Sequence, residues 1–179
     1  MSRLKDKYRK IAVPALRKEF GITNVMAVPR ITKVTVNTGV GRVHREAAVL
    51  EKIERDLGII TGQKASAREA KKSIASFKLR EGSTVGYSAT LRGKRMWDFL
   101  DRFISLALPL SKDFRGIETR NVDQNGNLSV GIKEHSIFPE VNLESVKDIF
   151  GLQVTITTTA KNREQGIALF RSIGIPLKK

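Results

Sequence analysis

The residues best suited to chemistry in this sequence lie in a basic stretch, residues 70–82, which mixes bases, hydroxyls and one aromatic ring. Lysine and arginine neutralise phosphates and release counterions, and an aromatic ring can stack on a nucleobase or a ribose. The side chains suited to these contacts are Lys71, Lys72, Ser73, Phe77, Lys78 and Arg80. The structural alternative is that Ile74, Phe77 and Leu79 pack beneath a loop whose lysines are only solvated. We favour a loop that binds nucleic acid.

A second basic cluster, residues 91–95, falls where a predicted strand passes into a predicted helix. At such a junction the bases and the free amides of the helix N-terminus can both face phosphates. Residues 37–42 also follow a strand and precede a helix. However, His44 stands where a dinucleotide fingerprint needs its third glycine, and no P-loop lysine follows. The segment predicts a tight turn, or a loop whose amides contact an RNA phosphate.

No combination of residues predicts catalysis, a cofactor or a metal site. His44 and His135 are the only histidines, the chain has no cysteine, and neither histidine has a second ligand at metal-binding spacing. Asp98 and Asp101 lie three residues apart in a predicted helix with bases nearby, which favours solvated or ion-paired carboxylates over a catalytic dyad. The serines show no nucleophile-elbow pattern. We therefore expect a protein that is not an enzyme and that needs no cofactor.

The overall charge indicates a polyanionic partner. The 179 residues contain 33 Lys and Arg against 18 Asp and Glu, a formal net charge of +15. A domain this basic usually meets nucleic acid, an anionic membrane surface or an acidic protein. No apolar run approaches the roughly 20 residues of a membrane span, no secretory segment is recognisable, and the lack of cysteine fits a reducing cytosol. We expect a cytoplasmic protein without a membrane partner. A structural RNA-binding protein, a free regulator that binds RNA or DNA, and a binder of acidic surfaces remain as alternatives.

The charge is distributed unevenly along the chain. Residues 64–95 carry nine bases and two acids, whereas residues 96–160 carry six bases and nine acids. Basic segments therefore bracket a mildly acidic section, which indicates two faces with different partners.

The elements that must position these residues alternate between helices and strands. Helical spacing predicts helices over residues 3–20, 45–57, 94–108 and 162–173, and two-residue alternation predicts strands over residues 31–40, 65–70, 84–91, 128–132 and 152–159. Pro14 should kink or divide the first helix, Pro109 should end the third, and Asn125-Gly126 should form a hairpin turn. Asn162 can cap the last helix, with Gln165 three residues later as its capping-box partner. We expect one α+β domain over residues 1–179. It should be a two-layer sandwich in which helices pack on one face of a largely antiparallel sheet and residues 71–82 form a long basic loop.

Several strings of residues occur in an order and at a spacing that resemble one known family. They are VPRI (28–31), VNTGVG (36–41), ITGQK (60–64), AKKSI (70–74), FKLREG (77–82), TLRG (90–93), MWDFL (96–100), DFRG (113–116), GN (126–127), IFPE (137–140) and TTTA (157–160). Together they closely resemble the bacterial-type family of large-subunit ribosomal protein five, which binds 5S rRNA. The resemblance runs essentially from end to end.

The resemblance implies a non-enzymatic component of the central protuberance of the large ribosomal subunit. Family members help attach 5S rRNA to the large-subunit rRNA, lie among neighbouring central-protuberance proteins and share an α+β sandwich fold. In the family a long basic loop reaches toward the P-site tRNA, and by its motif that loop is residues 71–82 here. The family also contacts a basic small-subunit head protein in an intersubunit bridge.

The resemblance also directs attention to particular residues. For 5S rRNA we favour uncharged hydrogen-bonding residues inside family motifs, with bases beside them: Asn37, Gln63, Thr90, Lys64, Arg92 and Lys94. The alternatives are local: Asn37 closes the turn at Gly39, Gln63 serves the turn at Gly62, and Thr90 is simply a strand residue. The acidic section would suit a basic small-subunit protein electrostatically. Its candidate residues are Glu134, Glu140, Glu144 and Asp148.

Overall fold

Five strands form one antiparallel sheet in the computed structural model, which describes residues 3–41, 47–77, 79–112, 114–141 and 149–178. The strands are β1 (Ile31–Gly39), β2 (Ser66–Glu69), β3 (Thr84–Leu91), β4 (Leu128–Ile132) and β5 (Leu152–Thr158). Their order across the sheet is β2-β3-β1-β5-β4, and every neighbouring pair is antiparallel. The predicted α+β class is confirmed, and the sheet is antiparallel throughout.

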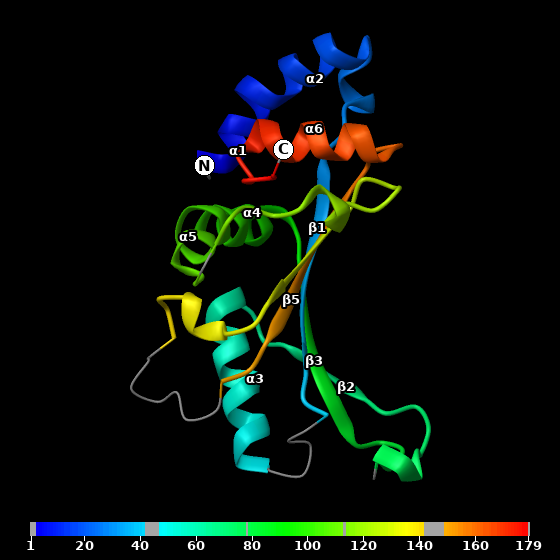
Figure 1. The fold of residues 1–179 in the computed structure, drawn as a ribbon, viewed down its shortest axis with the longest axis vertical. Coiled ribbons are helices and arrows are strands. Elements are labelled where there is room, and N and C mark those ends of the chain that lie inside the picture. Colours follow the sequence, from blue (N-terminus) through cyan, green and yellow to red (C-terminus); the bar gives the residue numbers. More distant parts are fainter. Residues whose placement is uncertain (1–2, 42–46, 78, 113, 142–148, 179) are drawn as a thin grey trace.

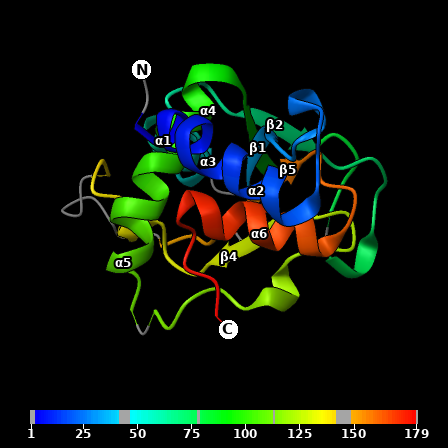
Figure 2. The ribbon, with the colours of Figure 1, turned by 90° about the horizontal axis from the view of Figure 1, so that it is seen from above.

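The helices lie on one side of this sheet and at one of its ends. They are α1 (Arg3–Lys7), α2 (Val13–Phe20), α3 (Ala47–Thr61), α4 (Gly93–Arg102), α5 (Leu108–Leu110) and α6 (Arg163–Ile173). Helices α3 and α4 lie against the same face of the sheet (Figure 1). Helix α2 and the segment Tyr8–Ala12 before it pack beside α6 at the upper end of the molecule, whereas α1 packs on α4 (Figures 1 and 2).

The strand sequences form a sheet with one apolar face because successive side chains point to opposite sides. In β1 the side chains of Val34, Val36 and Thr38 are buried, whereas those between them are partly or fully exposed. The covering helix α4 contributes Phe99, which stacks on Phe103 with ring centroids 5.9 Å apart. Both rings also stack on Phe138, at 6.1 and 6.4 Å. This aromatic group joins the α4 segment to the turn that follows β4.

Two prolines are accommodated by π-helical turns. Tyr8–Ala12 is a π-helical segment between α1 and α2 that ends two residues before Pro14, so the first predicted helix is divided as expected. Phe103–Ala107 forms a second such segment between α4 and α5. The prediction that Pro109 ends this helix is wrong, because helical structure continues to Leu110. The wider turn, in which the Leu108 N–H bonds to the Phe103 carbonyl, leaves room for a residue that has no N–H of its own.

Turns and caps follow the local sequence closely. The Asn125-Gly126 turn forms with Gly126 at φ 72°, and the Asp123 carboxylate accepts a hydrogen bond from the Asn127 N–H at 2.7 Å. The strand before this turn is reduced to a single bridge between Val122 and Leu128. Helix α3 continues to Thr61, four residues beyond its predicted end. Among the described residues, no helix has both the length and the apolar character that a membrane crossing requires.

The cap of α6 forms from the predicted pair of residues. The Asn162 side chain accepts a hydrogen bond from the Gln165 N–H at 3.0 Å, and the Gln165 side chain accepts one from the Lys161 N–H at 3.1 Å. Each side chain satisfies an amide at the helix start that has no intrahelical partner, so the sequence itself determines where α6 begins.

Candidate nucleic-acid interface

The face of the sheet opposite α3 and α4 is lined mostly by uncharged polar side chains, and we call it the polar face. Strand register places Asn37 beside Ser88, and Thr35 between Thr90 and Thr155. The uncharged members of the polar face are Thr35, Asn37, Ser88, Thr90, Ser129, Gln153 and Thr155. Ser88 is buried, and the other six are partly or fully exposed. They share a face because they occupy paired positions or positions two residues apart along a strand. Hydroxyl and amide groups on a fixed backbone can bind the 2′-hydroxyls and base edges of RNA.

The structure brings together the three residues that the sequence singled out for 5S rRNA. Asn37 and Thr90 are exposed diagonal neighbours on the polar face. The Gln63 amide donates a hydrogen bond to the Thr90 carbonyl at 3.1 Å, which attaches the end of the α3–β2 connection to β3. The side chains of Asn37 and Thr90 form no hydrogen bond with any described part of the chain. Their polar atoms are therefore available to a ligand.

Two of the predicted bases lie at the N-terminus of α4. Arg92 is the residue that precedes the helix, and Lys94 lies in its first turn; both are exposed. Arg95, in the same turn, reaches the Gln63 side-chain oxygen at 3.5 Å. The basic junction predicted from residues 91–95 therefore adjoins the Gln63–Thr90 contact, so cationic groups lie beside the uncharged ones.

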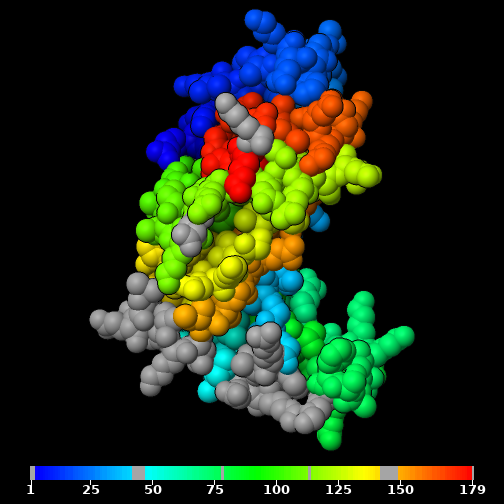
Figure 3. All heavy atoms as spheres, in the orientation of Figure 1, coloured from blue at the N-terminus to red at the C-terminus, as the bar shows by residue number. Residues whose placement is uncertain are grey.

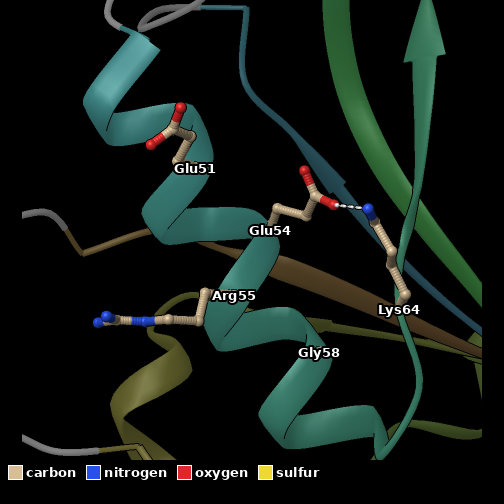
Figure 4. A pocket seen from close by; sticks show the side chains of 5 residues that line it. All are labelled: Glu51, Glu54, Arg55, Gly58 and Lys64. Atoms are coloured by element: carbon tan, nitrogen blue, oxygen red, sulfur yellow. Dashed lines mark ion pairs between the residues drawn. The ribbon is translucent and has the colours of Figure 1, made fainter.

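Lys64 lies next to Gln63 in the chain but extends toward α3. Its ammonium group is 3.4 Å from the Glu54 carboxylate, and its side chain is 85% exposed. In the close view these two side chains point toward one another, whereas Glu51 and Arg55 point elsewhere (Figure 4). An exposed ion pair of this kind is worth about 0–1 kcal/mol, so Glu54 holds Lys64 only weakly. Lys64 thus borders the site without joining the other three residues.

The basic loop, residues 71–82, is the tip of the β2–β3 hairpin, and it projects from the body at the lower right of Figure 3. Its base is closed by hydrogen bonds between Ala70 and Ser83 and between Gly82 and Ala70, at 2.9 and 3.0 Å. Within it, Ile74 and Leu79 pair through two backbone bonds. The Ser73 hydroxyl accepts a hydrogen bond from the Glu81 N–H at 3.0 Å, so this side chain helps to shape the loop.

The loop presents its bases and its aromatic ring to solvent. Phe77 is 73% exposed and Ile74 is 42% exposed, so neither packs beneath the loop in the way that the structural alternative required. Lys71, Lys72 and Arg80 are exposed, and none forms an ion pair within the described ranges. Lys78 lies outside the described residues.

Of the four acidic residues predicted for an intersubunit contact, Glu134 and Glu140 belong to the described part of the chain. Glu140 forms a half-buried ion pair with Arg102, which also donates a hydrogen bond to the Ile60 carbonyl at 3.2 Å. Glu134 is partly exposed and accepts a hydrogen bond from the Ser136 hydroxyl at 3.4 Å. Glu144 and Asp148 lie outside the described residues. Glu140 is thus part of the internal packing, whereas Glu134 faces solvent in part.

His135 is a buried structural residue. Its ring is 1% exposed and stacks on Phe150 with centroids 3.9 Å apart, and its Nδ1 accepts a hydrogen bond from the Phe150 N–H at 3.4 Å. Its Nε2 lies 3.9 Å from the carboxylate of buried Asp56. Burial lowers the pKa of His135, and the nearby Asp56 carboxylate opposes this effect only in part. In the described part of the chain, no three His, Asp or Glu residues are placed to hold a metal ion.

Sequence reasoning missed five members of the polar face: Thr35, Ser88, Ser129, Gln153 and Thr155. The signal was the two-residue alternation in the predicted strands, clearest in residues 31–40 and 152–159, where the positions between the apolar residues are mostly occupied by Thr, Asn and Gln. Register also places two bases on this face, Lys33 beside Thr157 and Arg68 beside Gly86. Uncharged hydrogen-bonding groups and cations thus share one face, a combination that suits contacts with both the sugars and the phosphates of RNA.

The fold and the candidate site together define the class of protein to which this chain belongs. The protein is a basic α+β protein with one sheet face covered by helices and the other left polar and open. Its net charge of +15 and the hydrogen-bonding groups on its open sheet face favour a role in binding.

Comparison with known proteins identifies the family within this class. The family model for ribosomal protein L5 matches residues 24–80, and the model for the C-terminal part of the same ribosomal protein family matches residues 84–177. The large ribosomal subunit protein uL5 of Thermobifida fusca is 50% identical over 177 residues, which cover 99% of this chain and 93% of that protein. The proteins of the same name from Rubrobacter xylanophilus and Colwellia psychrerythraea are 48% and 46% identical, covering 99% and 100% of this chain and 99% of each relative.

The chain therefore belongs to the ribosomal protein L5 family. It is a structural, non-enzymatic constituent of the large ribosomal subunit and takes part in translation. Its general partners are ribosomal RNA and other ribosomal proteins.

Proposed function

We propose that the polar face binds 5S rRNA and that the protein helps attach this RNA to the large-subunit rRNA in the central protuberance. The observation that carries the proposal is the juxtaposition of Asn37, Gln63 and Thr90, with two of the three side chains free of internal hydrogen bonds among the described residues. Arg92 and Lys94 at the start of α4 supply charge for phosphates, and Lys64 can leave Glu54 to do the same. Neighbouring central-protuberance proteins complete the assembly.

The test is filter binding of the purified protein to 5S rRNA and to a transfer RNA across a salt series, with Asn37→Ala and Gln63→Ala alongside. Specific binding should survive moderate salt for 5S rRNA and fall about threefold to tenfold in each variant, because one hydrogen bond contributes about 0.5–1.5 kcal/mol. Gln124→Ala removes an exposed amide elsewhere and should change nothing. Equal affinity for both RNAs, lost with salt and unaffected by the variants, would mean that only the net charge binds RNA.

We further propose that the basic loop contacts the P-site tRNA. Lys71, Lys72 and Arg80 are exposed and unpaired among the described residues, and Phe77 is available for stacking on a base or a ribose. Lys78 and Ser73 belong to the same loop, the latter through the hydrogen bond that shapes it. The projection of this hairpin beyond the body supports a contact with a partner outside the 5S rRNA site (Figure 3).

For the intersubunit bridge, we propose that a basic small-subunit head protein meets the acidic section of the chain. Glu134 is partly exposed, and Glu144 and Asp148 follow it in the same acidic segment of the sequence. Glu140 contributes only if its pair with Arg102 opens. Charge complementarity of this kind increases the association rate, so Glu134→Gln should slow subunit joining most at low salt.

A further inference from the structure

The two edges of the sheet differ in how they are protected. Strand β2 forms one edge and β4 forms the other. An edge strand offers unpaired N–H and carbonyl groups to any other extended chain, and proteins usually block it with charges, a proline or a bulge. Strand β2 contains Arg68 and Glu69, and its register with β3 shifts between them. Strand β4 has the sequence LSVGI, without charge or proline, and pairs with β5 in unbroken register. The edge at β4 therefore lacks this protection.

The backbone of Gly131 faces the open side of β4. The Asn127 carbonyl accepts a hydrogen bond from the Asp123 N–H at 2.9 Å, on the side of β4 away from β5, where Val122 bridges Leu128. Backbone groups two residues apart along an antiparallel strand point to the same side, so the N–H and the carbonyl of Gly131 point that way too. No backbone hydrogen bond from another described residue reaches Gly131 on this side. A donor and an acceptor therefore stand unused there.

The open edge of β4 borders two hollows in the surface. One, of about 580 Å³, is lined by residues 130–133 and by the segment 116–121. The other, of about 690 Å³, is lined by residues 131–134 and 110–112. Both volumes fall within the range of about 300–1,000 Å³ that is usual for ligand sites. Figure 2 shows β4 on the side of the sheet where α5 and the C-terminus lie. The edge is therefore accessible to a further chain.

A strand paired with β4 would meet different chemistry on its two faces, because successive side chains of a strand point to opposite sides. On the side of the helical layer, Val130 and Ile132 are buried, and Leu110 at the end of α5 is 60% exposed. On the other side Gly131 is exposed and adds no side chain that would obstruct a partner, and exposed Lys133 follows directly after the strand. These surroundings suit a chain in which apolar side chains alternate with charged or polar ones.

The charge around the edge favours acidic side chains in this partner. The two hollows are lined by four bases and two acids, which are Lys112, Arg120, Lys133, Lys178, Glu118 and Glu134. The Glu118 carboxylate is already paired with Arg120 and Lys178. Lys112 and Lys133 are exposed, and no carboxylate in the described ranges forms an ion pair with either. Two cations beside the open edge are therefore available to a partner.

We propose that the open edge of β4 binds an extended segment of another protein, in which acidic and apolar side chains alternate, as a further strand of the sheet. The bound segment would pair its backbone with Gly131, place its acidic side chains near Lys112 and Lys133, and cover Leu110. The inference goes beyond the proposed RNA contacts, because β4 lies at the opposite edge of the sheet from the hairpin that carries the basic loop.

The same observations disfavour two other occupants. A second copy of this chain would bring another net charge of +15 and the same unpaired lysines to the contact, so like charges would repel. A phosphate backbone offers hydrogen-bond acceptors to the Gly131 N–H but no matching row of donors for the carbonyls. A peptide backbone offers donors and acceptors in alternation, as a strand edge requires.

The test measures binding of a short fluorescein-labelled peptide, in which glutamate and valine alternate, to the full-length protein by fluorescence anisotropy. Gly131→Pro removes the outward N–H and places ring carbons in the path of an added strand, while Val130 and Ile132 keep their pairing with β5. Its matched control is Gly131→Ala, which keeps the N–H and whose Cβ has nothing within 4 Å.

A second pair of variants tests the charge. Lys112→Gln combined with Lys133→Gln removes the two cations beside the edge, and Lys10→Gln combined with Lys18→Gln removes the same charge from exposed lysines of the N-terminal helical segment. Circular dichroism establishes that each variant is folded. If Gly131→Pro does not fold, the lysine variants and the hydrogen exchange of the Gly131 amide in the unmodified protein decide the inference.

Gly131→Ala should bind the peptide within about twofold of the unmodified protein, whereas Gly131→Pro should lose at least about tenfold in affinity. The loss should be about threefold to tenfold for Lys112→Gln with Lys133→Gln, and less than about twofold for the control pair. A peptide with lysine in place of glutamate, or with a fully N-methylated backbone, should not bind. The glutamate peptide should slow hydrogen exchange of the Gly131 amide.

Equal binding to Gly131→Pro and Gly131→Ala, or equal binding of the glutamate and lysine peptides, would overturn the inference. Two further outcomes would also overturn it by giving the edge another occupant. Displacement of the peptide by equimolar 5S rRNA would make the edge part of the RNA surface. A dimer of the protein alone in sedimentation, abolished by Gly131→Pro, would assign the edge to a second copy.

Discussion

The polar face and the basic loop differ in how firmly the fold places their functional groups. On the polar face, uncharged side chains project from three central strands, and the ladder hydrogen bonds fix their spacing. In the basic loop, the bases lie on an irregular hairpin tip that a few backbone hydrogen bonds close. Short-range hydrogen bonds need fixed geometry, whereas charge attraction acts over several ångströms and tolerates movement. The proposed 5S rRNA site thus lies on the regular part of the fold, and the proposed tRNA contact lies on an irregular part.

The largest expected effect is a loss of stability when a residue of the central sheet is changed, and it tests how firmly the fold holds the polar face. A Cβ at Gly86 in β3 would lie 2.6 Å from the Thr38 carbonyl oxygen in β1, which is backbone and cannot turn aside. Gly86→Ala should therefore lower the free energy of unfolding by about 1–3 kcal/mol, measured by urea denaturation. Gly131→Ala in β4 is the matched control, since nothing lies within 4 Å of its added Cβ. Equal stability of the two variants would show that β1 and β3 can move apart at Gly86 at little cost in free energy.

A smaller effect tests the hydroxyls that the strand register aligns on the polar face. Thr35→Val keeps the shape and the strand preference of the residue but removes one hydroxyl between Thr90 and Thr155. Affinity for 5S rRNA should fall about threefold to tenfold, the equivalent of one hydrogen bond, while the melting temperature stays within about 2 °C. Thr23→Val, an exposed threonine outside the sheet, is the control for filter binding. An unchanged affinity would confine the RNA site to the neighbourhood of Gln63.

The strand that carries the polar face and the exposed basic loop could both be predicted from the sequence, because each depends on a local pattern of residue types. Alternation in residues 31–40 predicted β1, and the run of bases in residues 71–82 predicted an exposed loop. Family motifs then selected Asn37, Gln63 and Thr90, which the structure places together. Local chemistry also predicted the Asn162 cap, because a cap needs only residues three or four positions apart.

Contacts between segments that lie far apart in the sequence could not be predicted from local sequence patterns. The pair of Arg102 and Glu140, 38 residues apart, depends on how α4 meets the chain after β4, so Glu140 could not be distinguished from an exposed acid. Likewise, the position of Asp56 beside His135 depends on packing between α3 and the turn that follows β4. The extent of the polar face required the strand order β3-β1-β5-β4, which no single strand encodes.

The pH dependence of stability offers a further contrast with the polar face. Because burial lowers the pKa of His135, the folded protein keeps this ring neutral while the unfolded chain takes up a proton below about pH 6.5. The unfolded state then binds more protons, so the free energy of unfolding should fall as the pH drops from about 7.5 to about 5.5. His135→Gln should flatten this dependence in urea titrations. None of Asn37, Gln63 and Thr90 titrates in this range, and the 5S rRNA affinity of the folded protein should change far less than its stability.

The smallest expected effect comes from the basic loop and tests whether the two regions divide the work. Lys71→Gln, Lys72→Gln and Arg80→Gln remove exposed charges from a segment that contributes little to the core, so the free energy of unfolding should change by less than about 0.5 kcal/mol. Affinity for 5S rRNA at moderate salt should stay within about twofold, whereas binding of tRNA to the P site of reconstituted ribosomes should weaken. A loss of 5S rRNA affinity comparable to that of Asn37→Ala would make the loop part of the 5S rRNA site. The proposed division of roles between the polar face and the basic loop would then no longer hold, because 5S rRNA would bind to both surfaces.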